Sequence, residues 1–81
     1  MILISQDGQT TVKPEAVTME STVKGIAWKI YAWIGGHAFP MCSPYMNRQS
    51  VEPAYREIQA RLSGDSTYRI NLPEEDGEVM L

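Results

Sequence analysis

Apolar and polar side chains alternate along most of the chain, with the period of two that is typical of β-strands with one buried face. Six segments alternate in this way or are rich in β-branched residues: 2–5, 10–13, 17–22, 26–34, 37–41 and 67–72. Turn sequences separate them, such as Asp7-Gly8 after the first segment and Lys24-Gly25 after the third. The pattern therefore predicts a small antiparallel sheet of about five to six strands.

The Gly35-Gly36 pair predicts the tightest connection, because glycine adopts the positive φ angles that a two-residue hairpin requires. Counting outward from this turn gives three opposite pairs: Ile34–His37, Ala32–Phe39 and Ile30–Met41. Side chains directly opposite each other lie on the same side of a sheet. The isoleucine-rich face of residues 26–34 therefore gathers Phe39 and Met41, and we expect it to face the core.

One later segment has the period of a helix instead, with an apolar stripe at spacings of three and four residues. The stripe consists of Val51, Ala54, Tyr55, Ile58 and Leu62. Two N-caps compete at its start. With Ser50 as the cap, Pro53 falls in the first turn, where its missing N–H costs little; with Asn47 as the cap, it deletes an interior hydrogen bond. We therefore predict a helix capped by Ser50, with Asn47 as the alternative.

These elements predict one α+β domain over residues 1–73, in which the helix packs across one face of the sheet. A chain of 81 residues has room for a single core. Residues 74–81 are acidic and offer little to bury, so we expect a flexible tail there.

Composition narrows the possible partners and the compartment. The formal charge is −3, and the seven basic residues are scattered, whereas proteins that bind nucleic acid cluster theirs. The opening apolar run, residues 1–4, is far too short for a signal peptide or a membrane span. A single unpaired cysteine suits a reducing compartment. We expect a cytoplasmic protein that contacts neither nucleic acid nor membrane.

The few reactive side chains do not form a recognisable site. One cysteine and one histidine fall short of the four protein ligands of a structural zinc ion, so we expect no metal and no cofactor. Cys42 alternates to the opposite face from His37 on one strand, and neither has the neighbours of a catalytic nucleophile. We therefore expect no catalytic residue and no enzymatic activity. The alternative is a small-molecule binder or an enzyme subunit that uses the hairpin end near His37.

Two aromatic residues, Tyr31 and Trp33, fall on the face of the sheet that the helix should leave uncovered, beside Ala38, Pro40 and the stem of Lys29. Exposed aromatic side chains rimmed by polar residues are typical of protein–protein contacts. We therefore predict a protein-binding or assembly module, with a homodimer through Tyr31 and Trp33 as its simplest form. The alternative is that the sheet curls and the chain's own ends bury this face.

Four segments also carry a family resemblance: MILISQDGQTTV at the start, KIYAW in the middle, then YMNRQSVEPAYREIQARL and YRINLP. Over residues 1–75 the chain resembles a group of small uncharacterised proteins of Gram-positive bacteria and their phages. It departs from that group at residues 47–49 and at Pro53, where the group more often has Thr followed by acidic residues. The resemblance implies an accessory protein of a phage, a mobile element or its host, and it attaches no activity to any residue.

Overall fold

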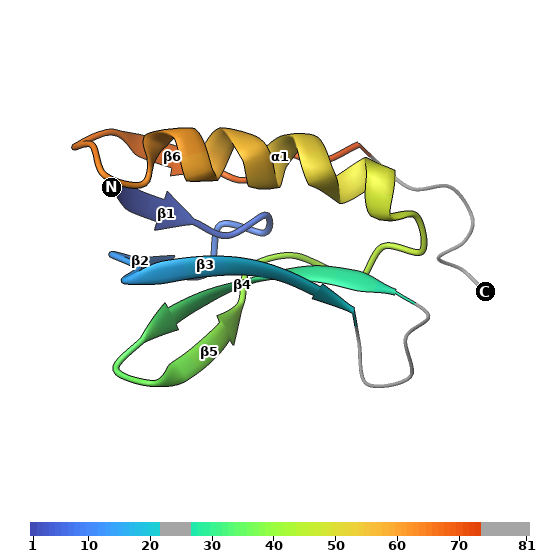
Figure 1. Cartoon of the computed structure of the whole chain (residues 1–81), viewed down its shortest axis with the longest axis horizontal. Helices are drawn as coiled ribbons and strands as arrows, with labels where there is room; N and C mark the ends of the chain where they lie inside the picture. The colour runs from blue at the N-terminus through green and yellow to red at the C-terminus, as the bar shows by residue number, and fades with distance from the viewer. Residues whose placement is uncertain (22–26, 74–81) are drawn as a thin grey trace.

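The computed structural model describes residues 1–21 and 27–73 and has one helix and six strands in that part of the chain (Figure 1). In chain order the elements are β1 (Ile2–Ile4), β2 (Thr11–Val12), β3 (Ala16–Ser21), β4 (Trp28–Ile34), β5 (His37–Pro40), α1 (Arg48–Arg61) and β6 (Thr67–Arg69). The expected turn at Lys24-Gly25 and the expected tail at 74–81 lie outside the described residues.

The strands form two three-stranded sheets, in the orders β2-β1-β6 and β3-β4-β5. The α+β class is thus confirmed, whereas the prediction of one antiparallel sheet is wrong, because β6 runs parallel to β1. Ile2 N donates to Ser66 O and Ile70 N donates to Ile4 O, both at 2.9 Å. A parallel pair needs a crossover connection, and no local sequence pattern in β1 or β6 predicts one. The helix and the strands before it supply that connection.

The β4–β5 hairpin has the predicted turn and register. Gly35 and Gly36 have φ angles of 57° and 84°, which side chains larger than hydrogen rarely adopt. The opposite pairs include Ile34–His37 and Ala32–Phe39, as expected. Beyond the strand, Met41 N donates to Ile30 O at 2.8 Å, which continues the same register.

Helix α1 begins earlier than predicted. Asn47 is its N-cap, with extended backbone angles and a side-chain oxygen that accepts from Gln49 N at 2.9 Å, so the expectation of a Ser50 cap is wrong. Pro53 consequently lies inside the helix, where it cannot donate to the Gln49 carbonyl. Residue Gln49 is exposed, so solvent can bond that carbonyl and the cost of the proline is small.

The core lies between α1 and the β3-β4-β5 sheet and is closed by β1 and by the segment after β6 (Figure 1). The largest fully buried side chains are Leu3, Ile30, Met41, Val51, Ile58 and Ile70. Two expected core residues differ: Trp28 is half-buried and Phe39 is 40% exposed. The helix contacts β3 and β4, and Phe39 lies on β5, the edge strand farther from it.

Candidate contact surface

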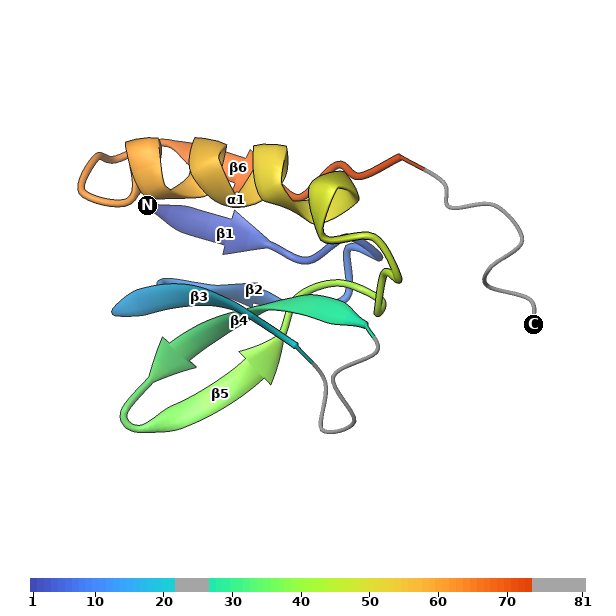
Figure 2. The ribbon, with the colours of Figure 1, turned by 45° about the vertical axis from the view of Figure 1, so that its right-hand side comes forward.

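The β3-β4-β5 sheet has two unlike faces. Helix α1 and β1 lie on one side of it, and no described element covers the other side (Figures 1 and 2). We call the uncovered side the outer face. By strand register and alternation it carries Ala16, Thr18, Glu20, Lys29, Tyr31, Trp33, Ala38 and Pro40. All four residues predicted for a protein contact therefore share this face.

The indole of Trp33 is held in place across the outer face. Its Nε1 donates to Thr18 Oγ1 at 2.8 Å, and the Thr18 hydroxyl donates to Glu20 Oε2 at 2.8 Å. The one polar atom of the indole is thus satisfied within the sheet. A contact made by this ring loses little side-chain freedom, because its orientation is already set.

Neighbouring strands already shield part of the aromatic surface. Tyr31 and Trp33 are half-buried, whereas Ala38 and Pro40 are exposed. The alternative in which the amino-terminal strand covers this face is wrong, since β1 lies on the helix side (Figure 2). The carboxyl-terminal residues that the same alternative invoked lie outside the described part.

One end of the outer face carries charge. Glu20 lies directly opposite Lys29 in the β3–β4 register. Among the described residues, however, Lys29 forms no ion pair, and the Glu20 carboxylate accepts from Thr18 instead. The outer face therefore changes along β4 from the aromatic Trp33 to an unpaired ammonium at Lys29.

The free edge of β5 offers few backbone groups. Ile30 and Met41 are a hydrogen-bonded pair, and such pairs alternate with unbonded ones in an antiparallel ladder. The backbone groups of Phe39 thus point to β4, and those of Ala38 and Pro40 point outward. Proline has no N–H, so Ala38 provides the outward donor of this pair, and the edge is a poor template for another strand.

His37 and Cys42 do not form a site together. His37 is exposed at the hairpin end, whereas Cys42 is 7% exposed and belongs to the core. Burial raises the pKa of the Cys42 thiol from its ordinary value of 9.0, and the Ile30 N–H and the Lys29 ammonium offset this only in part. The thiol is therefore held protonated at neutral pH, which disfavours reactivity.

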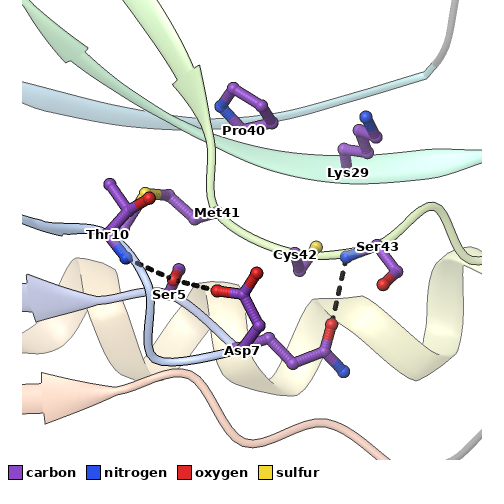
Figure 3. A pocket seen from close by; sticks show the side chains of 9 residues that line it. Ser5, Asp7, Thr10, Lys29, Pro40, Met41, Cys42 and Ser43 are labelled. Carbon is purple, nitrogen blue, oxygen red and sulfur yellow. Dashed lines mark hydrogen bonds between the residues drawn. The ribbon is translucent and has the colours of Figure 1, made fainter.

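A polar cavity of about 230 Å³ lies at the far end of β5 from His37 and borders the outer face at Lys29 and Pro40 (Figure 3). Its polar lining groups bond mainly to one another. Thr10 N donates to Ser5 Oγ at 3.1 Å, and the Ser5 hydroxyl donates to Asp7 Oδ1 at 2.6 Å. Across the cavity, Ser43 N donates to a Gln6 side-chain oxygen at 3.0 Å. We interpret the cavity as a joint between the first turn and the segment after β5.

The Asp7 carboxylate makes that joint sensitive to acid. The Ser5 hydroxyl and then the Gln9 N–H hold the pKa of Asp7 below its ordinary value of 3.8. A depressed folded-state pKa gives stability that is present above 3.8 and is lost as the pH falls through the lower, folded value. When the pH is lowered past that value, we expect the urea midpoint of unfolding to decrease more for the parent protein than for Asp7→Asn. An equal decrease of the midpoint with pH in the two proteins would contradict this assignment.

The sequence placed Lys29 beside Tyr31 and Trp33, whereas Thr18 and Glu20 were not predicted as members of the surface. The alternation of residues 17–22 does place Thr18 and Glu20 on one face. Their pairing with Tyr31 and Lys29 is the one that a two-residue turn at the expected Lys24-Gly25 gives by counting outward, but that turn lies outside the described residues. At Gly35-Gly36 both the turn and the β4–β5 register are described.

Comparison of the chain with known protein families, curated proteins and solved structures finds no match. Within residues 1–21 and 27–73, no three side chains of His, Cys, Asp or Glu gather as metal ligands. Helix α1, the helix in that part of the chain, is neither long nor apolar enough to cross a membrane.

Proposed function

We propose that this protein is a non-enzymatic protein-contact module whose binding surface is the outer face of the β3-β4-β5 sheet. The observation that carries the proposal is the fixed indole of Trp33, which has its Nε1 bonded to Thr18 and lies on a face that no described element covers. Aromatic anchors of this kind are enriched at the energetic centres of protein interfaces. The resemblance of residues 1–75 to proteins of phages and Gram-positive hosts supports an accessory role in that setting.

The composition of the outer face supports a protein partner over other classes. It combines two aromatic rings with Ala38 and Pro40, and it carries one cation and one anion. A nucleic-acid surface needs several clustered cations around such rings. The face is also a better site than the β5 edge, because Pro40 leaves that edge short of N–H donors.

Site-specific photo-cross-linking tests the proposal. A photoreactive residue replaces Ala38 on the outer face and, as the control, Gln49 on the exposed side of α1. In extract of the source cells we expect one protein, this chain or another, to cross-link through position 38 and not through position 49. Mass spectrometry identifies the adduct, and purified components must reproduce it. Trp33→Glu should abolish it.

Two results would count against a contact module. One is an equal yield of adducts at both positions, which indicates random collision. The other is an adduct at position 38 that Trp33→Glu leaves unchanged, because the Trp33 indole is the anchor on which the proposal depends.

A further inference from the structure

We infer that the partner of the outer face is a second copy of this chain, related by a two-fold axis that runs across the β4 strands at Tyr31. This inference rests on the proposed function and names its partner. In the resulting dimer, the Lys29 ammonium of each copy lies over the Trp33 indole of the other, and the two Tyr31 rings meet at the axis.

The order of side chains along β4 carries the inference. Trp33 lies at the hairpin end, Tyr31 in the middle, and Lys29 at the other end of the same face. Trp33 and Lys29 are four positions apart along the strand, which is about 13 Å at about 3.3 Å per residue. A half-turn about an axis across the strands at Tyr31 exchanges these two positions. The face is therefore complementary to itself when the strands of the two copies run in opposite directions.

The other two-fold arrangement is less favourable. An axis along the strands places each residue of β4 over the same residue of its mate, so the two Lys29 ammonium groups meet in the central column of the interface. Lys29 has no ion pair among the described residues that would offset this repulsion. An ammonium over an indole is attractive, and tryptophan is the best of the aromatic side chains in this role.

The local charge also suits a second copy. The outer face carries Lys29 and Glu20 and is neutral as a whole, whereas the chain has a formal charge of −3. Two copies, each negatively charged as a whole, therefore meet through faces that are neutral and do not repel each other. The half-buried tryptophan and tyrosine supply apolar contact at the centre of that surface.

The size of the face sets the expected affinity. Three strands about 4.8 Å apart and six residues long cover about 14 × 20 Å, which is well below the ~800 Å² that each partner of a stable complex buries. We therefore expect a reversible dimer with a dissociation constant on the order of 10 µM.

Sedimentation equilibrium across this concentration range tests the partner. We expect the parent to dimerise and Trp33→Glu to weaken self-association by more than about tenfold, as for an interface anchor. Gln49→Glu adds the same charge on exposed α1 and should leave the dimer unchanged. If Trp33→Glu does not fold, as judged by circular dichroism, Lys29→Glu serves instead, because it places a carboxylate over the indole. If the parent stays monomeric, or if the variants dimerise as strongly as the parent, the inference that the partner is a second copy is wrong.

Disulfide cross-linking tests the direction of the strands. An equimolar mixture of Trp33→Cys and Lys29→Cys should give a cross-linked heterodimer on mild oxidation, and this heterodimer retains one native Lys29–Trp33 contact. Trp33→Cys alone should give little cross-linked dimer under the same oxidation. Efficient cross-linking of Trp33→Cys alone, with none in the mixture, overturns the axis across the strands. The native Cys42 is buried and remains in every variant, and the oxidised parent serves as the control.

The two proposals fail in different ways. A monomeric parent together with a specific adduct to another protein at position 38 refutes the second copy and leaves the contact module standing. A dimer that Trp33→Glu does not disturb, with no specific adduct at position 38, refutes both.

Discussion

Replacement of Ile58 by alanine is expected to lower the free energy of unfolding by about 2–4 kcal/mol, the usual cost of removing a core isoleucine. Ile58 is 0% exposed and lies in the centre of the stripe by which α1 contacts β3 and β4. The substitution leaves a cavity between layers that are held by strands and cannot close over it freely. Urea denaturation followed by circular dichroism measures the loss, and an unchanged slope shows that the same surface unfolds.

Arg56→Ala on the same helix is the matched control for Ile58→Ala. The Arg56 side chain is 75% exposed, and its ion pair with Glu52 lies at the surface. Exposed pairs of this kind contribute little, so we expect a change within about 0.5 kcal/mol. A loss for Ile58→Ala that is no larger than the loss for this control would mean that the apolar stripe of α1 does not hold the core together.

Tyr45→Phe is expected to destabilise the protein by about 1–2 kcal/mol, although it removes a single oxygen atom. Tyr45 is 4% exposed, and its hydroxyl accepts from Gln6 Nε2 at 2.8 Å and donates to the Pro73 carbonyl at 2.7 Å. These bonds join the first turn, the segment after β5 and the end of the described chain. Removing the oxygen takes this partner from Gln6 Nε2 and from the Pro73 carbonyl, in bonds that are partly buried.

Tyr55→Phe controls for the loss of a tyrosine hydroxyl as such. Tyr55 is half-buried on α1, and its hydroxyl makes no hydrogen bond within the described residues. Thermal unfolding of the two variants beside the parent should show a clear drop in the midpoint for Tyr45→Phe alone. Equal midpoints for Tyr45→Phe and the parent would mean that the two hydrogen bonds of this hydroxyl do not stabilise the protein.

The β4–β5 hairpin shows how far local sequence can lead. Gly35 and Gly36 determine both the turn and the register, because a two-residue loop permits one pairing. Register in turn assigns faces, so the common side of Tyr31, Trp33, Ala38 and Pro40 followed from the sequence. The helix stripe was equally predictable, since Val51, Ala54 and Ile58 are buried as their spacing indicates.

The start of the helix shows where local rules compete. Proline favours the first turn, which argued for a Ser50 cap, and Asn47 is itself a strong cap residue. The free energies of helices capped by Ser50 and by Asn47 differ by less than the contacts around the helix start contribute. Here the Asn47 side chain bonds Gln49 N and the longer helix results, with Pro53 at an exposed position inside it.

The sequence by itself determined the class of each element, the hairpin register and the sharing of one face by the predicted contact residues, because these depend on neighbours in the chain. The tertiary structure decided the division into two sheets, the parallel pairing of β6 with β1 and the exposure of Phe39. It also brought the Thr18 hydroxyl within hydrogen-bonding distance of the Trp33 indole N–H. Each of these depends on which distant strands meet, and hydrophobic burial rewards many such pairings almost equally until the whole core is packed.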